Sequence, residues 1–315
     1  MVNRRNFLVG ALAVAGALAL GRSSLAQNPI AIGVATPGLP WDLTSLNHHE
    51  AVIAKRNAIV NFFWSWDDAN YTPDMSLFAN IAARGSVPMI TWMPQDYRLR
   101  NQSAYSLSAI LRGRHDAFLA GWARSMATYD GPVLMRFAHE MNGNWYSWSG
   151  RGNTASEYVQ VWRKLVTMFR AAGATNVKWV WCPNVENRDP APWFPGDAYV
   201  DYVALDGYNS TTFGWRSFDA IFRSSYNRIC QISTKPVMIA EVGTSEGVGD
   251  AKAVWLRDMF ATVATMPRVI AVVYFDVNMT AQEGPGRDWR IESSASALEA
   301  YRAAVAPLSS TLMVV

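Results

Sequence analysis

The sequence has few cysteines and histidines, the residues that cross-link small folds or bind metal ions. Its 315 residues include two cysteines and four histidines. Cys182 falls at the end of a predicted strand and Cys230 late in a predicted helix, so a bridge between them is not expected. No zinc-site spacing occurs among the histidines, which are His48, His49, His115 and His139. We therefore expect two free thiols and no bound metal.

Phosphate-binding loops and a strong charge of one sign are also missing. Residues 33–38, after the first predicted strand, read Gly-Val-Ala-Thr-Pro-Gly and match neither the dinucleotide pattern nor the P-loop pattern. The formal net charge is +3 and is spread along the chain, without the basic stripe that nucleic acid requires. These absences predict no cofactor and exclude nucleic acid as the expected partner.

Beyond the N-terminus there is no apolar run long enough to span a bilayer. Residues 1–26 are typical of a signal peptide: an apolar run at 7–20 is followed by small residues at 24–26. Residues 4–8 read Arg-Arg-Asn-Phe-Leu, which favours a twin-arginine signal over an ordinary secretory one. We predict an exported, periplasmic or extracellular monomer without membrane contact after cleavage, in which residues 27–315 form one domain.

Half of the residues are hydrophobic, and short apolar runs alternate with longer stretches of helical spacing. This alternation is typical of repeated β-α units around a parallel sheet. Strands are predicted at 30–36, 59–64, 88–92, 133–139, 177–182, 202–205, 237–240 and 269–275. Helices are predicted at 76–84, 109–127, 155–171, 218–232, 251–266 and 294–306. Eight such strands fit a single closed (β/α)8 TIM barrel of the α/β class better than an open doubly wound sheet.

Polar side chains gather where the predicted strands end, and in a barrel those ends meet at the face that carries active sites. These residues are Asp67, Asp68, Glu140, Asn184, Asp206, Glu241 and Asp276. Glu140 and Glu241 matter most, because they end the fourth and seventh strands, which lie nearly opposite each other. The alternative is that each is a structural ion-pair partner or a cap. Two charges at the ends of apolar strands are costly without a task, which favours a working pair.

Two carboxyl groups that flank one centre are the machinery for cleaving a glycosidic bond. In the retaining mechanism they lie about 5–5.5 Å apart, one as nucleophile and the other as acid and then base. Period-two alternation places Arg136 on the same side of its strand as Glu140, where its charge would help keep Glu241 ionised. Glu140 must instead stay protonated until it acts.

Residues 139–145, His-Glu-Met-Asn-Gly-Asn-Trp, resemble glycoside hydrolase family 26, a clan A family of endo-β-mannanases and of enzymes acting on mixed-linkage glucans and xylans. Further matches follow in family order at 179–184, 201–209 and 235–243. The resemblance implies an endo-acting hydrolase that cleaves a β-linked polysaccharide with retention, and the signal peptide predicts that it is secreted. It implies β-mannan first, then mixed-linkage glucan or xylan, with Glu140 as acid/base and Glu241 as nucleophile.

The resemblance also implies which residues contact the sugar. His139 would lie beside the scissile bond, Tyr208 would hydrogen-bond near the nucleophile, and Trp145 would stack on a sugar ring. Asn142 would fix its loop or touch the substrate. Strand-end residues complete the predicted substrate-binding set, namely Arg136, Asn184, Trp66 and Trp92. For the last two tryptophans, packing in the core is an equally good interpretation.

One departure from the family pattern is visible in the eighth strand, which ends Tyr274-Phe275-Asp276 where the family commonly has a tryptophan beneath the sugar. The loop at 287–290 is expected to return to the same face. Two alternatives to hydrolysis stay open: glycosyl transfer that remodels a bacterial surface polysaccharide, and a noncatalytic carbohydrate-binding barrel. The retained glutamate pair argues against the second. In each case the partner is a polysaccharide or oligosaccharide.

Overall fold

The computed structural model describes residues 30–67, 72–150, 152–185 and 187–314, so the signal-peptide prediction for residues 1–26 lies outside the described residues, as does Asp68. Eight parallel strands pair in chain order and close, since β1 pairs with both β2 and β8. The predicted (β/α)8 TIM barrel is confirmed. Among these residues, no helix combines the length and apolar character needed to cross a membrane.

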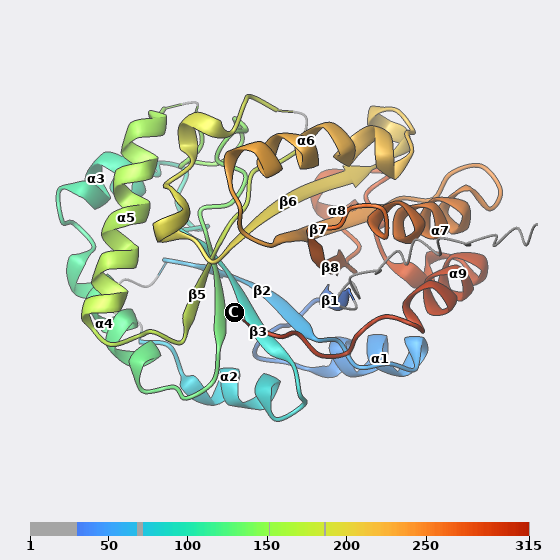
Figure 1. Ribbon diagram of the computed structural model, residues 1–315, viewed down its shortest axis with the longest axis horizontal. Helices are drawn as coiled ribbons and strands as arrows, with labels where there is room; N and C mark the ends of the chain where they lie inside the picture. The colour runs from blue at the N-terminus through green and yellow to red at the C-terminus, as the bar shows by residue number, and fades with distance from the viewer. Residues whose placement is uncertain (1–29, 68–71, 151, 186, 315) are drawn as a thin grey trace, which may run out of the picture.

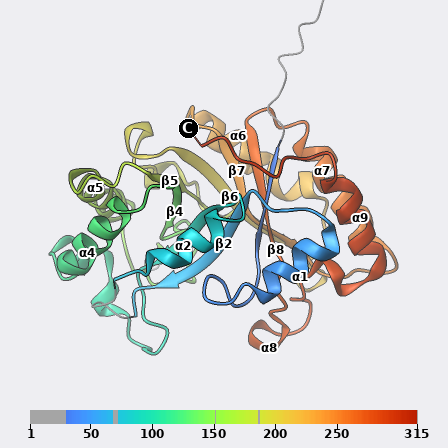
Figure 2. The same cartoon turned by 90° about the horizontal axis from the view of Figure 1, so that it is seen from below.

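Helices flank the strands on the outside in both views (Figure 1, Figure 2). The strands are β1 (Ala31–Ala35), β2 (Ile59–Ser65), β3 (Val87–Met93), β4 (Val133–Phe137), β5 (Val177–Trp181), β6 (Tyr202–Asn209), β7 (Val237–Thr244) and β8 (Val269–Phe275). The α-helices are α1 (Thr44–Ile53), α2 (Met75–Ala82), α3 (Leu107–Leu111), α4 (Asp116–Ala127), α5 (Ala155–Ala171), α6 (Phe218–Ile232), α7 (Ala251–Val263), α8 (Thr280–Glu283) and α9 (Ala295–Val305). Short 3-10 helices are η1 (Ser103–Tyr105), η2 (Ala191–Trp193), η3 (Asp197–Tyr199), η4 (Thr211–Phe213) and η5 (Ile291–Ser293).

Two helical regions differ from the prediction. The helix expected over 109–127 is interrupted between α3 and α4, where Gly113 has a φ of +88°, a left-handed conformation that suits glycine and ends a helix. Helix α1 was not predicted from the sequence. Its buried face includes His49 and Glu50, which interrupt the apolar period, and the residue before it, Leu43, has no side-chain cap, although Asp42 Oδ1 accepts from the Thr44 amide at 2.9 Å.

The core has two parts. A cluster inside the barrel includes Ile59, Met89, Leu134, Met238 and Val273, and a larger cluster fills the space between the strands and the helices. Together they seal the barrel below its C-terminal face, and the polar strand ends lie above them.

Trp66 and Trp92 belong to the larger cluster. Both are fully buried, with ring centroids 4.8 Å apart, and both pack against Phe118 of α4. Neither can stack on a sugar, so the prediction that they bind substrate is wrong. On β3 the inward position is taken by Thr91, and alternation turns Trp92 toward the helices.

Candidate active site

Glu140 follows β4 in a segment with an unusual backbone. Ala138 and Glu140 have φ values of +44° and +54°, which side-chain-bearing residues rarely adopt. The Glu140 amide donates to the Cys182 carbonyl at 2.8 Å, and the Trp148 indole donates to the His139 carbonyl at 2.7 Å. Strained backbone of this kind persists where neighbouring contacts fix it, and here it aims a carboxyl group.

The carboxyl group of Glu140 is buried and bound at both oxygens. Asn184 Nδ2 donates to Oε1 and Trp145 Nε1 donates to Oε2, each at 2.7 Å. Burial and the negative charge of Glu241 raise the pKa of Glu140 to about 7, against the opposing effect of these two donors. A carboxyl group with this pKa can hold a proton near neutral pH and still release it, as an acid/base requires.

Glu241 lies in β7 among donors of a different kind. Tyr208 Oη donates to its Oε2 at 2.6 Å, and the guanidinium of Arg136 donates to its Oε1. Arg136 is fully buried and also donates to Asp206 at 2.6 Å, while the register between β6 and β7 shifts at Asp206. Although burial opposes its charge, the carboxylates of Asp206 and Glu241 hold the pKa of Arg136 well above its usual range. The glutamate therefore faces a permanent cation.

His139 lies beside these groups and is buried. Burial, and then the charge of Arg136, hold the pKa of His139 well below its usual range, so the ring is neutral. Candidate ligand atoms of His139, Asp206 and Glu241 lie within 4.8 Å of one another. Arg136 already pairs with both carboxylates and supplies the positive charge there, so this trio does not suit a resident cation. The absence of a metal stays a prediction.

Aromatic rings surround the glutamate pair. Trp145 is 47% exposed, and Tyr146 stacks on Trp148 at 4.3 Å. Phe275, half-buried at the end of β8, contacts Phe63 and Tyr208 edge-on, each at 5.8 Å. Phe275 thus occupies the strand position where the family resemblance led us to look for a tryptophan. Exposed and half-buried rings beside polar groups suit the apolar faces of sugars.

Three other residues singled out from the sequence contact protein groups in the structure. Asn142 is buried and fixes its loop, donating to the carbonyls of Asn184 and Arg188 and accepting from the Asn184 amide. Arg136 is inaccessible, so we correct its predicted contact with substrate: it contacts Glu241 instead. Asp276 pairs with the buried ring of His49 at 2.7 Å and has a structural role.

Sequence reasoning assigned no role to Phe63 or to the pairing of Asp206 with Arg136. The half-buried Phe63 also lies 5.8 Å below the guanidinium of Arg136. The alternation of β2 could have placed Phe63 inside the barrel, because Phe62 and Trp64 on either side pack outward. The pairing depends on strand register, which the sequence does not show.

Residues 243–247 read Gly-Thr-Ser-Glu-Gly, the spacing of a nucleophile elbow. Ser245 is nevertheless buried within this segment. Its hydroxyl donates to the Glu246 carbonyl, and its amide donates to the Asn209 carbonyl. With no histidine in contact with that hydroxyl among the residues described, the segment does not form a serine-hydrolase site.

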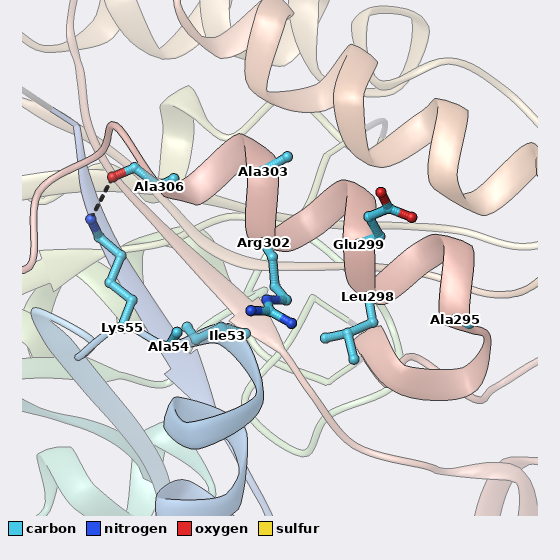
Figure 3. Close-up of a pocket in the computed structure, with 9 residues that line it drawn as sticks. All are labelled: Ile53, Ala54, Lys55, Ala295, Leu298, Glu299, Arg302, Ala303 and Ala306. Atoms are coloured by element: carbon cyan, nitrogen blue, oxygen red, sulfur yellow. Dashed lines mark hydrogen bonds between the residues drawn. The ribbon is translucent and has the colours of Figure 1, made fainter.

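A cavity of about 750 Å³ lies elsewhere, between the end of α1 and helix α9 (Figure 3). Its lining includes Ile53, Leu298 and Arg302, and Lys55 Nζ donates to the Ala306 carbonyl at 2.9 Å. None of the residues of the glutamate site lines this cavity.

A closed parallel barrel with two carboxyl groups after β4 and in β7, held in different electrostatic surroundings, is an arrangement suited to cleaving glycosidic bonds. The chain belongs to glycosyl hydrolase family 26, whose model matches residues 46–266. The resemblance that the motifs indicated is confirmed.

Individual relatives extend this similarity. Endoglucanase H of Acetivibrio thermocellus is 38% identical over 261 residues, which are 78% of this chain and 27% of that protein. Mannan endo-1,4-beta-mannosidase A and B of Caldalkalibacillus mannanilyticus is 32% identical over 123 residues, 37% of this chain and 22% of that protein. The chain thus spans about a quarter of the length of these relatives.

Among solved structures, a modular endo-beta-1,4-mannanase from Cellulomonas fimi has the same fold. Its TM-score is 0.68 at 22% sequence identity, and the match covers 91% of this chain and 72% of that one.

Proposed function

We propose that the chain is a retaining, endo-acting glycoside hydrolase of β-linked polysaccharides. The observation that carries the proposal is the contrast between two neighbouring carboxyl groups. Glu140 is buried with a pKa of about 7, whereas Glu241 faces the guanidinium of Arg136 and the hydroxyl of Tyr208. Environments that separate two carboxyl groups in this way define an acid and a nucleophile.

The residues act in two steps. Glu241 attacks the anomeric carbon while Glu140 gives its proton to the leaving glycosidic oxygen, which forms a glycosyl ester on Glu241. Glu140 then takes a proton from water as that water attacks the anomeric carbon, and the Glu241 carboxylate is released. Arg136 and Tyr208 hold the carboxylate in place, and Asn184 and Trp145 hold the Glu140 carboxyl group.

For the substrate we propose β-mannan, in line with the family resemblance and with the mannosidases among the relatives. A β-glucan is the second candidate, because the relative that matches 78% of this chain at 38% identity is an endoglucanase by name. Each name describes a protein much longer than the matched segment, so direct assay decides between the polymers.

The experiment is a product screen of purified residues 27–315 on mannan, glucomannan, mixed-linkage glucan and xylan. Glu241→Ala and Glu140→Ala should each lower turnover on the polymer by about 10²–10⁴ or more. The exposed Glu299, at the cavity of Figure 3, offers the matched control Glu299→Ala, which should keep full activity.

The leaving group separates the two roles. A substrate with a good leaving group needs no acid, so it should restore the first step in Glu140→Ala and not in Glu241→Ala. Release of a range of oligosaccharides marks endo action. If no polymer is cut by the unaltered chain, hydrolysis is the wrong reaction, and binding or glycosyl transfer takes its place.

We further propose that the protein is exported by the twin-arginine route and works as a monomer outside the cytoplasm, without contact to membrane or nucleic acid. The support is the Arg-Arg-Asn-Phe-Leu order at residues 4–8 and the mild net charge of +3. Fusion of residues 1–26 to a reporter tests the route, since replacing Arg4 and Arg5 with lysine should block export of the folded reporter.

A further inference from the structure

In the loop between β8 and α9, three consecutive residues each have one backbone group bound to a buried side chain. The contacts are Tyr274 Oη to the Trp289 carbonyl at 2.8 Å, Lys252 Nζ to the Arg290 carbonyl at 2.6 Å, and the Ile291 amide to Asp276 Oδ1 at 2.8 Å. We call these three contacts the loop clamp. Because they come from α7 and from β8 and its end, they fix the backbone around Trp289 in space.

Lys252 is the least ordinary member of the loop clamp, because it is fully buried on α7. An ammonium group is costly to bury unless its donors are used. Besides the Arg290 carbonyl, Lys252 Nζ donates to Ser293 Oγ at 2.8 Å, and Ser293 Oγ lies 2.5 Å from Glu246 Oε1. Glu246 follows β7, the strand of the nucleophile, so this network joins the two loops next to Glu241.

Trp289 is the residue whose position the loop clamp fixes. It is 2% exposed, so it cannot stack on a sugar. Its indole lies 4.9 Å from the ring of Tyr208 at an angle of 42°, and its Cβ lies 3.2 Å from where a Cβ at Gly243 would be. The Tyr208 ring would lie closer still, at 3.0 Å, so the absence of a side chain at Gly243 leaves room for Tyr208 and Trp289 together.

We propose that Trp289 is a positioning residue for the nucleophile, acting through Tyr208, and that Lys252 holds Trp289 in place. The inference rests on the proposed function of Glu241. The ring of Tyr208 contacts Phe275 edge-on and packs against the indole of Trp289 in a tilted arrangement. The Tyr208 hydroxyl lies 2.6 Å from Glu241 Oε2. Two ring contacts on a phenol whose hydroxyl is bound leave it little freedom to swing away from the carboxylate.

A double-mutant cycle tests the inference. Tyr208→Phe should lower kcat about tenfold or more, the value of a hydrogen bond to a charged group. Trp289→Leu should lower kcat about three- to tenfold with KM nearly unchanged, since Trp289 does not reach the sugar. The double variant should be no slower than Tyr208→Phe alone, because Trp289 has nothing to position once the hydroxyl is gone. Effects that multiply in the double variant would overturn the inference.

The supporting variants separate positioning from folding. Lys252→Met should act in the same direction as Trp289→Leu, and Trp289→Phe should restore part of kcat and serves in its place if the leucine variant does not fold. Trp122→Leu removes an equally buried tryptophan that packs against Phe118 of its own helix, so it should lower stability without changing kcat.

Crystal structures of the same variants give a measurement that needs no activity. The distance from Tyr208 Oη to Glu241 Oε2 should lengthen beyond hydrogen-bond range in Trp289→Leu and in Lys252→Met. A distance that stays at 2.6 Å in both overturns the positioning role, whether or not the protein cleaves a polymer. If the unaltered chain cuts no polymer, the proposed function fails separately.

Discussion

The pKa of Glu140 is set by a few identifiable atoms. Burial and Glu241 raise it, whereas the amide of Asn184 and the indole of Trp145 lower it by donating to the carboxylate. An acid must carry its proton, so we expect kcat/KM to fall as the pH rises above about 7.

Asn184→Ala tests this assignment. Removing a donor to the charged form raises the pKa of Glu140, so the alkaline limb of kcat/KM should move to higher pH by about half a unit to one unit. Asn101→Ala is the control, because this exposed side chain accepts from the Ser103 amide and is not one of the two donors to Glu140. An alkaline limb that stays in place or moves to lower pH would contradict the assignment.

The same burial makes Glu140 a cost to stability. Its pKa in the folded chain, about 7, lies above the usual value of 4.5, so folding disfavours the ionised form. The contribution of the protonated group is fully present below pH 4.5 and is lost as the pH rises through 7.

Glu140→Gln removes this ionisation. In urea unfolding at pH 8 the variant should be more stable than the unaltered chain by about 1–3 kcal/mol, and the difference should shrink toward zero near pH 4.5. A difference that is equal at both values of pH would show that the carboxylate is not penalised by burial.

Local order in the sequence was enough to place the two glutamates, because each follows an apolar strand that must end at the open face of a barrel. It left Trp92 open between the core and the substrate, since sequence order alone does not show whether the ring at the end of that strand faces the helices or the open face of the barrel. It could not find Lys252 either, whose burial depends on a carbonyl 38 residues further along the chain.

At the scale of elements, helix α5 shows how a local signal fixes a boundary. Thr154 accepts from the Glu157 amide while the Glu157 carboxylate accepts from the Thr154 amide, which is a complete capping box. The predicted range of this helix, 155–171, agrees with the structure end to end. Helix α1 has no capping box: Leu43 precedes it without a side-chain cap, and Asp42 Oδ1 binds the Thr44 amide.

Thr154→Ala removes the cap of α5. We expect a loss of about 1 kcal/mol in the free energy of unfolding, because an amide at the helix start loses its acceptor. Activity at a temperature well below unfolding should not change. Ser156→Ala, in the first turn of the same helix, should stay within about 0.5 kcal/mol. Equal losses in the two variants would mean that the capping box contributes nothing specific.

For the whole molecule, the order of strands brings Glu140 and Glu241 together, since neither residue is near the other in the chain. The number and spacing of apolar runs made the barrel predictable. Closure itself depends on how β1 fits between β2 and β8, which no local pattern describes. Gly33 is the residue at which this fit is tightest: it pairs with Ile59 on one side and with Val273 on the other.

Gly33→Ala tests closure of the barrel. An added Cβ would lie 2.9 Å from Ile59 Cβ and Val273 Cγ2, and 3.0 Å from the Ile59 carbonyl, inside the buried cluster of the barrel. Overpacking of this kind should lower the free energy of unfolding by about 1–3 kcal/mol in urea, with kcat unchanged. Gly121→Ala in α4, where nothing lies within 4 Å, should instead stabilise by about 0.5–1 kcal/mol. If both substitutions stabilise, there is space for a side chain at Gly33. In that case the close packing of β1 against β2 and β8 is not what closes the barrel.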